Sequence, residues 1–292
     1  MRRFLPLFFL LMIGLSPARA QVPVVRFQVE SAAGRAVAET CAEVWQTQGP
    51  ILAMDLLPRG VTPDTVDCLI MDTASFQRNF QGSAPDWGVG LAWPSGRMVA
   101  LDYSRLPAVG RGVREVFLHE MVHALLFQAS GEAWLPTWFH EGVAMDYSGE
   151  WKFSDTVSLV LDGRVPSLDR LQGRFPAHTH AADRAYRTSL LAVNRLQDAH
   201  GEDVILRLIT ASAEAGDFEA GFYRVTGTEV SIFYTDFASA MQLRLGWLVM
   251  LTRWPSLFVL MALVFAAGAV RKLILTRRRL REMEEEEGPD LD

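Results

Sequence analysis

The sequence predicts an α+β protein, with an N-terminal mixed sheet that includes a hairpin, then a helical part and one C-terminal transmembrane helix. Stretches with the patterns of strands come first along the chain, up to residue 102, and stretches of helical spacing follow them. Strands first and helices afterwards is the order of an α+β fold. The transmembrane helix is predicted from residues 254–270, which carry no charge, as expected of a membrane span.

The first twenty residues have the pattern of a secretory signal peptide. Arg2 and Arg3 precede an apolar run, and the small residues Ala18 and Ala20 suit the site at which a signal peptidase cuts. Residues 1–20 are therefore predicted to be removed, which leaves a mature chain that begins at Gln21. The alternative is an uncleaved anchor, for which the apolar core is short.

Residues 21–245 contain no repeat or low-complexity linker, and they are predicted to form one extracytoplasmic domain. Its first part has strand patterns with one stretch of helical spacing between them, and its second part is helical throughout. The expected elements in chain order are a strand at 24–29, a helix at 32–46, a strand at 66–71, a hairpin of strands at 88–93 and 98–102, and helices at 113–128, 136–147, 182–199, 203–213 and 231–243.

The C-terminal region has the pattern of a membrane anchor. Residues 254–270 are seventeen residues without a charge, about 25 Å as a helix, and the predicted span of 254–275 requires Arg271 and Lys272 to snorkel. The basic residues behind the span place the tail, 276–292, in the cytoplasm and the domain outside it. The sequence thus predicts a single-pass protein of the plasma (inner) membrane, with the lipid bilayer as a partner and a solvated, disordered charged tail. A buried core helix is the alternative.

Composition excludes several classes of protein. The chain has 292 residues, of which 50% are hydrophobic and 21% charged, so a disordered chain, a collagen-like repeat and a disulfide-stapled miniprotein are excluded. A net charge of −6 argues against a general nucleic-acid binder. Cys41 and Cys68 are too few for a cysteine-based zinc or iron–sulfur site. They are either bridged, as an oxidising compartment allows, or two buried thiols.

One motif in the predicted helix 113–128 points to chemistry. His119 and His123 are four residues apart, so both imidazoles lie on one helix face and can bind one metal ion. Glu120 lies beside them, within reach of a metal-bound water, as a zinc hydrolase requires. Two surface histidines on an amphipathic helix are the alternative. A catalytic zinc site needs a third protein ligand, for which Glu141 is the candidate, whereas the neighbouring His140 points about 100° away around its helix.

The sequence HEMVH, followed by LPTWFHEGVAMDYSG from residue 135, resembles the gluzincin metallopeptidases, in particular the peptidase MA-like group. In that family a helix with two histidines precedes a helix of the pattern P-x-W-x-x-E-G-x-A, which supplies a glutamate ligand. The matching residues are Pro136, Trp138, Glu141, Gly142 and Ala144. The resemblance covers roughly residues 85–245. It implies a thermolysin/gluzincin-like catalytic domain. Because Gly142 and Ala144 are small, we expect the glutamate helix to approach the histidine helix closely.

The resemblance also implies an activity and a set of roles. One Zn²⁺ per chain would be bound by His119, His123 and Glu141, and Glu120 would act as the general base on a metal-activated water that hydrolyses a peptide bond. Tyr186 would face the site and donate to the oxyanion, although a core tyrosine is the alternative. The partner is then a peptide or protein substrate, which the strand 88–93 can pair with by β-augmentation.

Two expectations concern the surroundings of the metal and the class of the protein. Thermolysin-like enzymes have an aspartate four residues after the glutamate ligand, where this chain has Met145. Asp146 and Ser148 are possible partners for the hydrogen bond to a zinc-binding histidine, but neither stands at the position where the family has its aspartate. The alternative function is a catalytically silent peptidase-fold binding module at the membrane surface.

Overall fold

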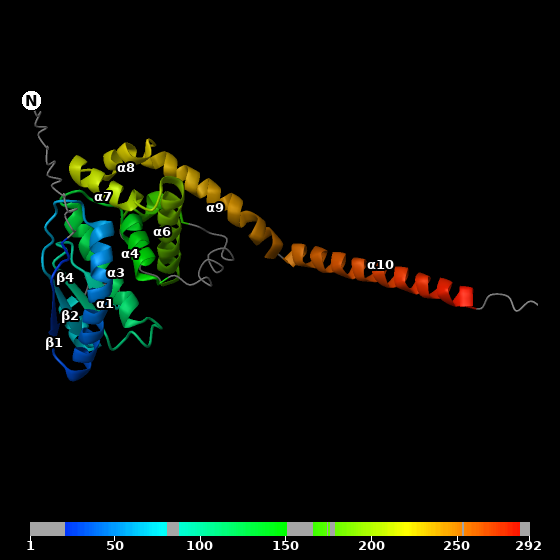
Figure 1. The fold of residues 1–292 in the computed structure, drawn as a ribbon, viewed down its shortest axis with the longest axis horizontal. Coiled ribbons are helices and arrows are strands. Elements are labelled where there is room, and N and C mark those ends of the chain that lie inside the picture. The colour runs from blue at the N-terminus through cyan, green and yellow to red at the C-terminus, as the bar shows by residue number, and fades with distance from the viewer. Residues whose placement is uncertain are drawn as a thin grey trace, which may run out of the picture.

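The computed structural model describes residues 21–80, 88–150, 166–173, 175, 179–252 and 254–286. The predicted signal peptide, residues 1–20, lies outside the described residues. In chain order the elements are β1 (Val25–Val29), α1 (Ala32–Leu56), β2 (Val66–Met71), α2 (Thr73–Phe80), β3 (Gly90–Ala92), β4 (Met98–Asp102), α3 (Val113–Ser130), α4 (Thr137–Ser148), the 3-10 helix η1 (Leu168–Leu171), α6 (Thr179–His200), α7 (Val204–Ala215), α8 (Phe218–Thr226), α9 (Val230–Thr252) and α10 (Trp254–Glu286). The protein has a mostly helical α+β fold with a small mixed sheet (Figure 1).

The sheet has four strands in the order β1-β2-β4-β3, with β1, β2 and β4 parallel and β3 antiparallel to β4. Successive side chains of a strand point to opposite faces. In β2, Val66, Cys68 and Ile70 pack in the main core with α1 and α3, whereas Leu69 and Met71 pack in a smaller cluster with α2. The sheet therefore lies between two helical layers, and β3 is an edge strand of it.

The helices α3 and α4 form the centre of the helical part. α4 contacts α3 on one side and α6 on the other, and it begins directly after Pro136 and ends at Gly149, which has a left-handed φ of 72°. A Cβ atom on Gly142 would overlap the backbone oxygen of Ser189 and lie 2.6 Å from Cγ2 of Val193. The close approach at Gly142 is thus between α4 and α6, and the expectation that it serves the contact with the histidine helix α3 is wrong.

α9 joins the core by its N-terminal part only. Tyr234, Phe237 and Met241 are buried there, and the Tyr234 hydroxyl accepts a hydrogen bond from Nε1 of Trp138 in α4, with a donor–acceptor distance of 3.0 Å. Beyond this point the chain extends away from the sheet and its helices as the rest of α9 and α10 (Figure 1). α4, which bears Glu141, is therefore held by α9 in addition to α3 and α6.

The predicted fold class needs correction at the C-terminus. None of the helices in the described ranges is both long and apolar enough to cross a membrane. The expected thermolysin/gluzincin-like domain with one transmembrane helix at 254–275 is therefore replaced by a mostly helical α+β fold, in which no such helix occurs over the described ranges. The uncharged stretch of α10, 254–270, is seventeen residues, and its length of about 25 Å falls short of the ~30 Å of a hydrocarbon core. α10 then continues through charged residues to Glu286, where a disordered tail was expected.

Candidate metal centre

α3 and α4 bring the three predicted metal ligands together. His119 and His123 lie one turn apart on α3, and their rings meet edge to face with centroids 4.7 Å apart. Oε2 of Glu141, from α4, lies 3.2 Å from Nε2 of His119 and 3.3 Å from Nε2 of His123. One ligand atom from each residue falls within 4.8 Å of the others. The three residues that the sequence predicts as metal ligands therefore lie together in the fold.

The distances in this cluster suit a zinc ion. Imidazole nitrogens and carboxylate oxygens bind zinc at about 2.0–2.2 Å, so two such ligands in a tetrahedron lie ~3.3 Å apart. The two Nε2–Oε2 distances, 3.2 and 3.3 Å, agree with that separation. His119, His123 and Glu141 therefore fit a three-residue zinc site.

Opposite charges inside the cluster shift the pKa values of its members. Burial alone would raise the pKa of Glu141, but the positive charge of His123 and the hydrogen bonds to both histidines outweigh it and hold the pKa well below 4.5. Burial alone would lower the pKa of His119, but the carboxylates of Glu150 and Glu141 outweigh it and hold that pKa well above 6.5. In the metal-free protein the cluster is therefore a buried ion pair, which a cation can replace.

Glu120 lies between α3 and the edge strand β3. Its residue is 7% exposed, and burial raises its pKa above 4.5 although the nearby histidines oppose this shift. A Cβ atom on Gly90 of β3 would lie 2.8 Å from Cγ and Cδ of Glu120. The edge strand thus passes directly against this carboxylate, and only a residue without a side chain fits there.

The outer edge of β3 offers backbone groups to a partner. The backbone N–H of Asp102 donates to the carbonyl of Val89, and that of Trp93 donates to the carbonyl of Met98, each at 2.9 Å. Alternate residues of an antiparallel strand bond to opposite sides, so the peptide groups of Gly90 and Ala92 point away from β4. Among the described residues no strand pairs with that edge.

Tyr186 on α6 lies beside His119 of the candidate metal site. Its ring centroid is 6.4 Å from that of His119 and 5.2 Å from that of Phe175. Burial, followed by the negative charges of Glu141 and Glu120, raises the pKa of Tyr186 well above 10. The phenol therefore stays protonated near neutral pH and is a hydrogen-bond donor.

The predicted hydrogen-bond partners of the histidines lie elsewhere. Asp146 accepts a hydrogen bond of 2.9 Å from Nε2 of Gln197, and the hydroxyl of Ser148 donates to the backbone oxygen of Met145. The carboxylate that reaches the cluster is Glu150, whose Oε2 lies 3.5 Å from Nδ1 of His119. No motif in the sequence points to Glu150, because it lies past the end of α4, where helical spacing no longer predicts direction.

His140 packs beside the cluster and is not one of the converging ligands, as its direction on the helix predicted. Its ring lies 4.7 Å from that of Phe127 and 5.7 Å from that of His123. Burial, followed by the positive charge of His123, lowers the pKa of His140 to about 3. It is therefore a neutral aromatic group next to the candidate metal ligands.

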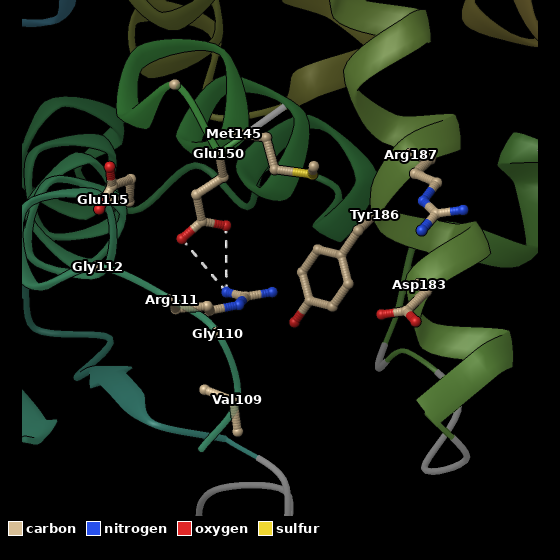
Figure 2. Close-up of a pocket in the computed structure, with 11 residues that line it drawn as sticks. Val109, Gly110, Arg111, Gly112, Glu115, Met145, Glu150, Asp183, Tyr186 and Arg187 are labelled. Atoms are coloured by element: carbon tan, nitrogen blue, oxygen red, sulfur yellow. Dashed lines mark hydrogen bonds and ion pairs between the residues drawn. The ribbon is translucent and has the colours of Figure 1, made fainter. Parts of the chain in front are cut away.

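A cavity of about 360 Å³ adjoins the cluster (Figure 2). Glu150 and Tyr186, which both contact His119, form part of its wall, and Arg111, Asp183 and Arg187 also line it. Figure 2 shows the guanidinium of Arg111 between the carboxylate of Glu150 and the ring of Tyr186. The cavity thus lies directly next to the candidate metal site.

Comparison with known proteins gives one distant relative. The chain is 28% identical over 174 residues to the uncharacterized protein YhcO of Bacillus subtilis (strain 168), a match that covers 56% of this chain and 52% of that protein. The chain spans about half the length of the curated relative it matches. No protein-family model matches the chain, and no solved structure matches it.

Proposed function

We propose that the protein is a zinc-dependent metallopeptidase with His119, His123 and Glu141 as its metal ligands. The observation that carries this proposal is the convergence of two imidazole nitrogens on one carboxylate oxygen, at 3.2 and 3.3 Å. Two histidines and a glutamate are the protein ligands of well-known zinc peptidases, in which the fourth position is left to water or substrate. The resemblance of both motifs to gluzincin metallopeptidases supports the same assignment.

The residues around the ligands support peptide hydrolysis. Zinc, when bound, supplies a Lewis acid that activates water and polarises a carbonyl. Glu120 accepts the proton of the attacking water and returns it to the leaving amine, and its raised pKa brings it nearer to neutral pH, where proton transfer in both directions is efficient. Tyr186, which stays protonated, donates a hydrogen bond to the oxyanion.

The substrate of this proposal is a peptide or an extended segment of a protein. The peptide groups of Gly90 and Ala92 face the free edge of β3, where a chain can add as a further strand. Gly90 also contacts Glu120, so a peptide on this edge passes close to the general base. Backbone pairing of this kind positions a peptide bond with little dependence on its side chains.

Metal content and peptide cleavage together test the proposal. Purified wild-type protein is compared with Glu120→Gln and His123→Ala, and with the exposed-residue controls Glu132→Gln and His180→Ala. We expect one zinc per chain in the wild type, in Glu120→Gln and in both controls, and loss of zinc in His123→Ala. Cleavage of a proteome-derived peptide library is expected from the wild type and the controls only, and a chelator should abolish it.

The outcomes separate the proposal from its alternative. Absence of stoichiometric zinc in the wild type would overturn the metal site and the enzyme together. Zinc that is retained without cleavage of any peptide in the library would favour a catalytically silent binding module instead.

A further inference from the structure

Nδ1 of His119 is the buried ring atom on the side away from Glu141. His119 is 6% exposed, and this nitrogen makes no close hydrogen bond within the described part of the chain. The carboxylate within reach is that of Glu150, with Oε2 at 3.5 Å. An imidazole that binds metal through Nε2 carries its hydrogen on Nδ1 and needs an acceptor there. Glu150 supplies the acceptor.

Arg111 holds the Glu150 carboxylate in this position. Its Nη1 lies 3.1 Å from Oε2 and 3.3 Å from Oε1 of Glu150 (Figure 2). Arg111 comes from the segment between β4 and α3, and Glu150 directly follows Gly149 at the end of α4. The side chain of Glu150 is 8% exposed, and that of Arg111 is 40% exposed. A carboxylate buried in this way needs a positive partner. Arg111 is that partner, and it belongs to a different segment of the chain from Glu150.

No other carboxylate in the described residues lies in place to accept a hydrogen bond from Nδ1 of His119. Glu141 contacts the opposite nitrogen of His119, Asp146 bonds to Gln197, and position 145, four residues after Glu141, is a methionine. The acceptor is therefore delivered by a glutamate nine residues after Glu141 in the sequence. The longer side chain and the turn at Gly149 bring it back to the ring of His119.

We propose that Glu150, held by Arg111, is the positioning residue of His119, which keeps the hydrogen on Nδ1 and directs Nε2 toward the metal. This inference rests on the proposed metal site. It adds that Arg111, a residue of the cavity wall, acts on the metal centre through Glu150. Loss of such a partner typically weakens metal affinity about 10- to 100-fold.

The test is a competition titration of the full-length protein with Zn²⁺ against a chromophoric chelator. The variants are Glu150→Ala, Glu150→Gln and Arg111→Met. Asp183→Asn is the control, because Asp183 also lines the cavity but lies on α6, across from Glu150 in Figure 2. The visible spectrum of the Co²⁺-loaded proteins reports the ligand geometry, which a merely structural role of Glu150 would leave unchanged.

We expect Glu150→Ala to bind zinc about 10- to 100-fold more weakly than the wild type, and Glu150→Gln, which keeps an acceptor oxygen without the charge, about tenfold more weakly. Arg111→Met should weaken binding in the same direction by less, and Asp183→Asn should equal the wild type. The Co²⁺ spectrum should change in both Glu150 variants. If Glu150→Ala fails to fold, the nearly isosteric Glu150→Gln decides the outcome.

The failures are distinguishable. A wild-type protein that binds no zinc contradicts the proposed function itself. A wild type that binds zinc, with an unchanged affinity and Co²⁺ spectrum in Glu150→Gln, contradicts only the positioning role of Glu150.

Discussion

Gly90 and Glu120 are in such close contact that a Cβ atom on Gly90 would lie 2.8 Å from Cγ and Cδ of the glutamate, and closer still to Oε1. Gly90 has no positive φ in this structure, so its backbone conformation does not require glycine. The requirement is steric. Any side chain at position 90 has to displace the carboxylate of Glu120 or the edge strand itself.

We therefore predict that Gly90→Ala lowers peptide cleavage by about 100-fold, because a misplacement of about 1 Å in a catalytic group costs that much. Zinc content should stay at the wild-type value, since the extra methyl group meets Glu120 and not a metal ligand. Gly173→Ala is the matched control, because a Cβ atom there meets nothing within 4 Å. Wild-type activity in Gly90→Ala would show that Glu120 is not the base.

A second glycine, Gly142, is predicted to act on stability. A methyl group there would collide with the backbone oxygen of Ser189 and lie 2.6 Å from Cγ2 of Val193, both on α6. Backbone cannot move aside as a flexible side chain can, so Gly142→Ala should lower the free energy of unfolding by about 1–3 kcal/mol. Denaturant unfolding of the metal-free proteins measures this, again with Gly173→Ala as control. An unchanged midpoint would contradict the tight packing of α4 on α6.

Local sequence patterns predicted the elements that depend on contacts between residues close together in the sequence. The strand at 66–71 and the start of α3 at residue 113 agree with the structure, because alternation and helical periodicity act over a few residues. The grouping of His119, His123 and Glu141 also follows local patterns, since the two histidines lie one turn apart and Glu141 belongs to a recognisable motif.

Other features depend on contacts that local patterns do not record. The helix predicted to end at residue 46 continues through Pro50 to Leu56. Leu52 and Leu56 are buried in that extension, so tertiary packing outweighs the proline. The helix α2 was not predicted, because its eight residues are too few to show a clear helical spacing of apolar side chains. The contact between Glu150 and His119 depends on a turn after α4, whose direction no helical spacing predicts.

His140 is predicted to be replaceable and to make the protein sensitive to acid. Burial and the positive charge of His123 lower its pKa to about 3 from 6.5, so it is neutral in the folded protein. A group with a lowered pKa stabilises the fold above its unfolded pKa, and this stabilisation is lost as the pH falls from 6.5 toward the folded value. His140→Phe should remove that part of the acid sensitivity.

The aromatic contacts of His140 with Phe127 and His123 should survive in His140→Phe. Its buried Nδ1 has no hydrogen-bond partner in the described residues, so removal of that polar atom costs little. We expect one zinc per chain and, at neutral pH, a free energy of unfolding within about 1 kcal/mol of the wild type. Unfolding curves between pH 4 and 7 test this, and loss of zinc in this variant would make His140 a ligand.

His119 makes zinc binding depend on pH. Burial alone would lower its pKa, but Glu150 and Glu141 hold it well above 6.5, so at pH 7 the metal-free protein carries a protonated His119. This raised pKa stabilises the metal-free fold, fully below pH 6.5, and the stabilisation is lost as the pH rises through the folded-state pKa. Because a metal binds only the neutral imidazole, zinc has to displace this proton.

We therefore predict that zinc binding at pH 7 releases at least one proton per chain, and that zinc affinity rises with pH until it passes the folded-state pKa of His119. Isothermal titration calorimetry in two buffers of different ionisation enthalpy counts the protons, because each released proton adds the heat of the buffer. Asp183→Asn, which leaves the neighbours of His119 unchanged, should release the same number. Binding heats that are identical in both buffers would show that His119 is already neutral before zinc arrives, and that its two carboxylate neighbours do not hold a proton on it.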